Sequence, residues 1–151
     1  MRQDLEKQVQ TLGIQEEVRF LGACQEDEVR QQYDWSQVVV LSSRSEGTPM
    51  TIIEAMAKAR AFVAPRITAI PEMIEDGRSG LLFIPGSAND LARQLTRLAS
   101  QPELLAKMST EARHTGEELF DLTVNAKKFL AVLAQEVPAL GLTPEVDIAP
   151  A

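Results

Sequence analysis

The feature that most restricts the fold of this chain is an apolar run at residues 38–41, Val-Val-Val-Leu, followed by a polar turn and a helical pattern. A short run of β-branched residues predicts a buried strand. A strand that leads through a turn into a helix is the repeating unit of open α/β sheets, which bind ligands outside the carboxyl ends of their strands. Residues 42–56 are therefore the first candidate for a site.

The helix after this turn is predicted to have Pro49 in its first turn. Proline suits that position because its φ is already helical and its missing N–H would have been unpaired there. Gly47 lets the backbone approach a ligand closely, since it has no Cβ. Unpaired N–H groups and the positive end of the helix dipole favour an anion at such a helix start.

Two carboxylates flank the helix start: Glu46 in the turn, and Glu54 about one and a half turns into the helix. Together with a phosphate-binding helix start, they predict a nucleotide-sugar site. In a structural alternative, Glu54 and Lys58 form an ordinary i,i+4 pair and Glu46 only complements the helix dipole. Glu54 is expected to face solvent with Thr51 and Lys58, and the apolar stripe is expected to hold Met50, Ile52, Ile53, Met56 and Ala57.

The same stretch resembles the Glu-x7-Glu signature of GT-B glycosyltransferases of family 4, the "glycosyl transferases group 1". The matching residues are Ser42, Ser45, Glu46, Gly47, Thr48, Pro49, Ile52, Ile53, Glu54, Ala55, Met56 and Ala57. Residues 18–22 resemble the family's V-x-F-x-G strand, and residues 70–83 resemble its G-x-P-E-x-x-x-x-G-x-x-G-x-L stretch. These motifs occur in the family's order, over about residues 14 to 134.

The resemblance implies retaining transfer of a sugar, of the hexosyltransferase type, from a nucleoside-diphosphate sugar, with no metal or other cofactor. Glu46, the candidate catalytic residue, would hold hydroxyls of the donor sugar, and Glu54 would hold the ribose hydroxyls. The diphosphate would bind the N–H groups of Gly47 and Thr48, beside Pro49.

Arg44 and Arg66 are the nearest candidates to balance the phosphate charge. The alternative is that both are solvated loop arginines.

The fold class implied by the resemblance is α/β, a Rossmann-like parallel sheet of the GT-B C-terminal domain, incomplete because its first strands have no counterpart here. Also without counterpart are a Gly-rich turn, a basic pair that helps neutralise the donor phosphates, and the acceptor domain. Unpaired strand edges are costly. We therefore expect the strands to re-pair within the chain, or the missing N-terminal portion or another chain, including a second copy, to fill the gap. The isolated chain is expected to be inactive.

Three positions depart from the family pattern. Ala59 stands where a glycine usually follows the central helix, so that helix is expected to end differently. Ala61 replaces a common proline, which is a minor change. Ala69 replaces a glycine beside the expected donor sugar, where the added methyl is expected to crowd the site or to change φ.

The remaining elements follow from periodicity and turn signals. Ser87 and Asp90 resemble a capping box for a helix that carries Leu91, Leu95 and Leu98. The helix at 122–136 is expected to turn Ala126, Phe129, Leu130 and Leu133 inward. Strands are predicted at 18–21, 37–41, 61–64 and 81–84, and further helices at 2–12, 26–34, 71–76 and 102–113.

Two aromatic side chains, Trp35 and His114, are candidate functional groups. Trp35 is expected to pack in the core, with base stacking as the alternative. His114 is expected at a helix end, as a partner of the helix dipole rather than as a catalytic base.

Composition limits the classes of partner. The 151 residues carry a net charge of −7, which argues against nucleic acid or an anionic membrane. One cysteine, Cys24, excludes an internal disulfide, and a single histidine disfavours zinc. A cytoplasmic location is the default expectation. Residues 1–136 are predicted to form one partial nucleotide-sugar-binding domain, and residues 137–151 a flexible tail.

Two functions fit these residues. The chain is either the donor-binding part of a glycosyltransferase, or a non-catalytic assembly module that kept the fold and binds a partner through an exposed sheet edge. The absent basic pair favours the second for the isolated chain.

Overall fold

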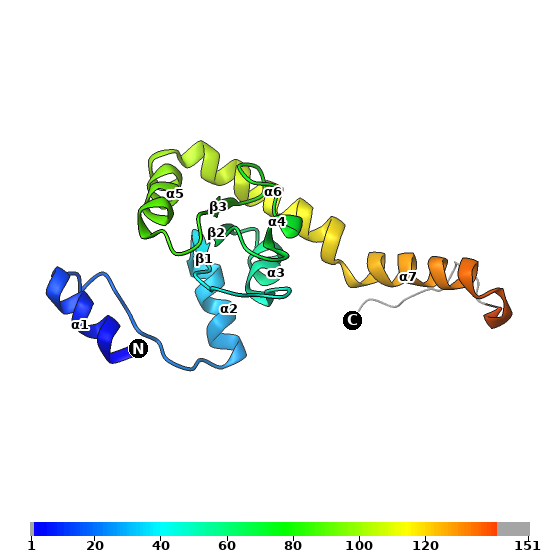
Figure 1. Ribbon diagram of the computed structural model, residues 1–151, viewed down its shortest axis with the longest axis horizontal. Helices are drawn as coiled ribbons and strands as arrows, with labels where there is room; N and C mark the ends of the chain where they lie inside the picture. The colour runs from blue at the N-terminus through cyan, green and yellow to red at the C-terminus, as the bar shows by residue number, and fades with distance from the viewer. Residues whose placement is uncertain (1, 142–151) are drawn as a thin grey trace. The chain divides into compact units, whose positions relative to one another are not determined.

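A three-stranded parallel sheet organises the second unit of the chain, residues 33–141, in the computed structural model, which describes residues 2–141 (Figure 1). The strands β1 (Val38–Val40), β2 (Ala61–Pro65) and β3 (Leu81–Phe83) lie in chain order across the sheet. The register pairs Val38 with Ala61 and Val63 with Leu81. Parallel neighbours need crossover connections, and helices occupy both of them.

Helices surround this sheet (Figure 1). The two crossovers contain α3 (Met50–Ala57) and the short α4 (Ile70–Met73). Then follow α5 (Ala88–Ser100), which packs on β3, and α6 (Pro102–Phe120), which packs along α3 and β2. The chain continues into α7 (Leu122–Glu136) and a 3₁₀ turn, η1 (Pro138–Leu140).

The hydrophobic core is centred on β2, in which all five residues are buried. One cluster joins this strand to β3, α5 and α6 through Ala61, Val63, Leu81, Phe83, Leu98 and Met108. Strands of parallel sheets are covered on both faces, so β2 is a continuous apolar run rather than an alternating one. Helix α3 buries Ile52, Ala55 and Met56. The predicted stripe was therefore wrong at Met50, which is 60% exposed, and at Ala57, which is also exposed.

The end of α3 also corrects the sequence prediction. The N–H of Ala59 donates to the Met56 carbonyl and that of Arg60 to the Ala55 carbonyl, at 2.9 and 2.8 Å. These two bonds form a Schellman motif, in which the residue after the C-cap is left-handed. Ala59 has φ +51°. Alanine therefore occupies the conformation that glycine would adopt at lower cost, and the helix does not end differently.

The predictions for two helices also needed correction, one in its end and one in its burial. Helix α6 runs to Phe120, beyond the predicted end at residue 113, so His114 lies inside the helix and is exposed. In the added part of the helix, a Cβ at Gly116 would lie 2.8 Å from the Met56 Cβ. This glycine permits a close approach of α6 to α3. Helix α7 has the predicted bounds but buries no residue, and Phe129 is 63% exposed.

Residues 2–32 form the first unit of the chain. It contains α1 (Arg2–Leu12) and most of α2 (Glu26–Trp35), and none of its residues is buried. The predicted strand at 18–21 is wrong, because these residues have no regular structure. A strand needs a neighbour to satisfy its N–H and C=O groups, and among the described residues the segment has none.

Further expectations concern the free edge and the termini. Among residues 2–141, β1 pairs with β2 alone, so the expected re-pairing within the chain is not observed. Trp35 is 84% exposed, so its predicted core packing is also wrong. Most of the predicted tail, residues 142–151, lies outside the described part of the chain. In the part that is described, no helix has both the length and the apolar character that crossing a bilayer requires.

Candidate functional site

The predicted helix start lies at the carboxyl end of β1. The N–H of Leu41, the residue after β1, donates to the Val63 carbonyl at 3.0 Å, and the loop at 42–49 then leads into α3. Pro49 is the N-cap, with φ −70° and ψ 114°, one position earlier than predicted. No side chain caps α3 there. The Ile52 N–H donates to the Pro49 carbonyl at 3.1 Å, which leaves the N–H groups of Met50 and Thr51 available to an anion.

A second loop is tied to the first. The Thr68 hydroxyl donates to the Glu46 backbone carbonyl at 2.5 Å. Thr68 has φ +41°, a conformation that is strained for a β-branched residue. Ala69 has φ −78°, so the change of φ predicted for Ala69 occurs one residue earlier, at Thr68. This bond joins the loop after β1 to the loop after β2, beside the candidate residue Glu46.

The candidate residues of the loop differ in exposure. Glu46 is half-buried, whereas Arg44, Gly47 and Thr48 are exposed. Among the described residues Arg44 forms no ion pair, so its charge is not neutralised by a neighbouring side chain. The roles assigned to these residues stay predictions.

Glu54 has a partner that the sequence did not suggest. Its Oε2 accepts a hydrogen bond from the Tyr33 hydroxyl at 2.8 Å. Lys58 pairs instead with Asp34, at 2.8 Å. The structural alternative, an i,i+4 pair of Glu54 with Lys58, is therefore not formed. Burial, and then the Glu54 carboxylate, raise the pKa of Tyr33 to about 12, so this hydroxyl stays protonated near neutral pH.

Two hollows lie near these loops. The first hollow, of about 480 Å³, is at the ends of β1 and β3. It includes Arg44 but neither Glu46 nor Glu54. Its lining residues are Ser42, Ser43, Arg44, Phe83, Pro85, Gly86, Ser87, Ala88 and Leu91.

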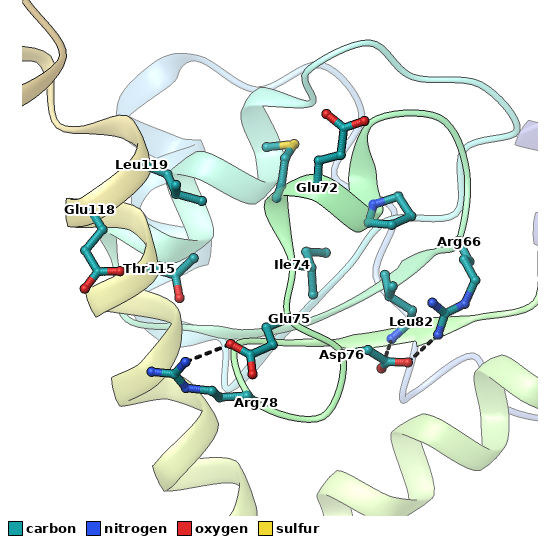
Figure 2. Close-up of a pocket in the computed structure, with 12 residues that line it drawn as sticks. Arg66, Glu72, Ile74, Glu75, Asp76, Arg78, Leu82, Thr115, Glu118 and Leu119 are labelled. Carbon is teal, nitrogen blue, oxygen red and sulfur yellow. Dashed lines mark hydrogen bonds and ion pairs between the residues drawn. The ribbon is translucent and has the colours of Figure 1, made fainter. Parts of the chain in front are cut away.

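The second hollow, of about 520 Å³, lies between α4, the turn before β3 and α6 (Figure 2). Arg66 lines it and forms an ion pair with Asp76, whose Oδ1 also accepts from the Leu82 N–H at 2.9 Å. Arg66 is therefore already paired, which weakens its candidacy for phosphate. Across the hollow, Arg78 bridges Glu75 and Glu111, at 2.7 and 2.8 Å. The sequence showed only a turn signal at residues 76–77.

Within residues 2–141, no three His, Cys, Asp or Glu side chains are grouped as metal ligands.

The sheet, its crossovers and the loop before α3 define a Rossmann-like domain of the GT-B class. The sequence model of the family described as "Glycosyl transferases group 1" matches residues 1–115, and the chain belongs to this family. Both the predicted family and the predicted fold class, an incomplete GT-B α/β domain, are confirmed.

Curated relatives support this assignment. A D-inositol 3-phosphate glycosyltransferase of Streptomyces bingchenggensis is 34% identical over 75% of this chain and 25% of its own length. An alpha-D-kanosaminyltransferase of Streptomyces kanamyceticus is 31% identical over 74% of this chain and 29% of its own length. The chain thus spans less than a third of the length of these relatives.

Solved structures show the same fold. The C-terminal domain of a glycosyl transferase group 1 family protein (LpcC) from Francisella tularensis superposes with a TM-score of 0.75 and 28% identity. That match covers 80% of this chain and 63% of the other. Anabaena HepE, solved in complex with UDP, superposes with a TM-score of 0.81 and 25% identity, over 88% of this chain and 36% of its own.

Proposed function

We propose that this chain is the donor-binding part of a retaining family 4 glycosyltransferase, which moves a sugar from a nucleoside-diphosphate sugar to an acceptor. The observation that carries the proposal is the start of α3, which follows the carboxyl end of β1 and has no side-chain cap at Pro49. That site suits a diphosphate. HepE, whose fold this chain shares, is solved with UDP and with UDP-glucose, which supports a nucleotide-sugar as ligand.

The roles within the site follow the family motif. Glu46 would contact the donor sugar, Glu54 the ribose hydroxyls, and the N–H groups of Gly47 and Thr48 the diphosphate. Stabilising the diphosphate leaving group would then supply most of the rate enhancement, without a metal ion. Turnover is proposed for the whole enzyme in the cytoplasm, and we expect the 151-residue chain alone to bind donor without turnover.

Calorimetry with UDP, GDP and ADP tests the proposal and identifies the base. Glu54→Gln should weaken binding by roughly 10- to 100-fold, because hydrogen bonds to a charged group contribute about 1.5–3 kcal/mol. Glu17→Gln, which makes the same charge change at an exposed position in the first unit, is the matched control. Equal affinities for the two variants would remove Glu54 from the site, and EDTA should leave the affinity unchanged.

The second candidate, an assembly module, is favoured by the free edge of β1. Among the described residues this strand has a partner on one side only, and an unpaired edge can accept a strand from another chain. Sedimentation separates the two functions. Concentration-dependent self-association without affinity for any nucleotide would support the module, whereas nucleotide binding by a monomer would exclude it.

A further inference from the structure

The carboxyl-terminal turn of α2 contacts α3 through two neighbouring residues, Tyr33 and Asp34. Tyr33 is the buried residue of α2, at 9% exposure. Its hydroxyl donates to Glu54 Oε2 at 2.8 Å, while the Thr51 carbonyl lies farther away, at 3.5 Å. Asp34 accepts from Lys58 through both carboxylate oxygens, at 2.8 and 3.0 Å.

These contacts separate two side chains that would otherwise pair with each other. Glu54 and Lys58 have the i,i+4 spacing at which an acid and a base on a helix attract each other, in the favourable order. Asp34 instead holds the ammonium group, and Tyr33 holds the carboxylate. Among the residues that the structure describes, no cationic side chain therefore forms an ion pair with Glu54.

The hydrogen bond from Tyr33 leaves most of the carboxylate free. An ionised carboxylate has about four acceptor positions, and the tyrosine hydroxyl occupies one of them. The remaining positions suffice for two vicinal hydroxyls of a ribose. A tethered side chain also loses less rotamer freedom when a ligand binds, so a fixed Glu54 binds more tightly than a free one.

We propose that Tyr33 and Asp34 are positioning residues for a ribose-binding carboxylate: Tyr33 fixes Glu54, and Asp34 keeps Lys58 from pairing with it. This inference rests on the proposed function, because it takes Glu54 to be the group that contacts the ribose. Two residues of α2, outside the Glu-x7-Glu motif, would thus strengthen the preference of the site for ribonucleotides.

The test compares two probes by calorimetry: whichever of UDP, GDP and ADP the wild-type chain binds most tightly, and the 2′,3′-dideoxy analogue of that nucleotide. Tyr33→Phe keeps the ring and removes the hydroxyl. It should weaken ribonucleotide binding by about 3- to 10-fold, the effect of one hydrogen bond, and leave the dideoxy affinity within about two-fold. Ser36→Ala, which removes a hydroxyl that bonds the Tyr33 carbonyl at 3.0 Å, is the matched control and should change neither affinity.

The role of Asp34 has its own rescue experiment. Asp34→Asn should release Lys58 to pair with Glu54 and weaken ribonucleotide binding by about 2- to 5-fold. Adding Lys58→Gln to that variant removes the competing cation and should restore the wild-type affinity. If the Asp34–Lys58 pair had a merely structural role, the double variant would bind the ribonucleotide no more tightly than the single variant.

Each outcome decides the proposal. An equal loss for both probes in Tyr33→Phe would show a structural role only, and an unchanged ribonucleotide affinity would exclude any contribution of the tyrosine. In either case the proposed function stands, provided that the wild-type chain prefers the ribonucleotide to its dideoxy analogue. A wild-type chain that binds none of the three nucleotides would overturn both the positioning role and the proposed function.

Discussion

The two units of the chain differ in what their secondary structure depends on. Residues 2–32 and residues 33–141 both contain helices where the sequence predicts them, but only the second unit contains strands. The run at 18–21, Val-Arg-Phe-Leu, has strand composition and remains irregular, whereas the run at 38–40 forms β1 against β2. A helix satisfies its own backbone groups, while a strand depends on a neighbour. A strand-like sequence is therefore a weaker predictor than a helix-like one.

The largest effect that tests this contrast is the loss of an aromatic ring from the core. Phe62 in β2 is 1% exposed, and Leu12 in α1 is 62% exposed. Phe62→Ala should lower the free energy of unfolding by about 3–5 kcal/mol. The control Leu12→Ala should lower it by less than about 0.5 kcal/mol. Urea denaturation measures both values, and similar losses would show that the first unit is also held together by buried contacts.

A smaller loss is expected where the backbone packs against that ring. A Cβ at Gly80 would lie 2.3 Å from Phe62 Cε2, whereas a Cβ at Gly47 has no atom within 4 Å. Because the Phe62 ring is buried and has little room to move, Gly80→Ala should destabilise the chain by about 1–3 kcal/mol. Gly47→Ala is the control and should be nearly neutral. If both variants unfolded at the same urea concentration, the packing around β2 would be looser than the structure indicates.

A gain of stability is expected at the end of α3. Ala59→Gly relieves the left-handed strain, and the gain is partly offset by the greater flexibility of glycine in the unfolded chain. The expected net change is about 0.5–1 kcal/mol in favour of the folded state. Ala57→Gly, inside the same helix, should act in the opposite direction by a similar amount. Thermal unfolding compares the two variants, and a shared sign would contradict the assignment of strain to Ala59.

The smallest effect concerns a carboxylate that holds the turn after β3. The Ile84 N–H donates to Asp90 at 2.7 Å, and this bond, followed by Arg93, lowers the pKa of Asp90 below its ordinary value of 3.8. Because the pKa of Asp90 is lower in the folded chain than in the unfolded chain, its ionisation stabilises the fold at pH values above its ordinary pKa. That stabilisation is lost as the pH falls through the pKa of the folded state. The difference in Tm between wild type and Asp90→Asn should thus shrink from pH 7 to pH 3.

Much of the fold was encoded locally enough to be predicted. The Ser87 hydroxyl accepts from the Asp90 N–H at 3.2 Å, as the capping pattern predicted, and α7 begins after Asp121 and ends at Glu136. Exposure was predicted less well, because it depends on which surfaces meet. Trp35 and Phe129 were expected to be buried and are largely exposed. Nothing in the sequence near either residue specifies a covering element.

In the candidate site, too, the local arrangement was predictable from the sequence and the long-range contact was not. The motif alone placed Glu46, Gly47, Thr48 and Pro49 together in the loop before α3, and Glu54 on the helix itself. The partner of Glu54 was missed because Tyr33 precedes it by 21 residues and lies in a different helix. Only the packing of α2's last turn on α3 reveals that contact.

The burial of β2 has a consequence for how variation can be distributed along this chain. Five successive side chains are enclosed, so the strand has no face on which polar replacements are harmless. In a scan of every single substitution, tolerance would not alternate with a period of two. Residues 61–65 would instead form one unbroken intolerant band, bordered by the arginines at 60 and 66.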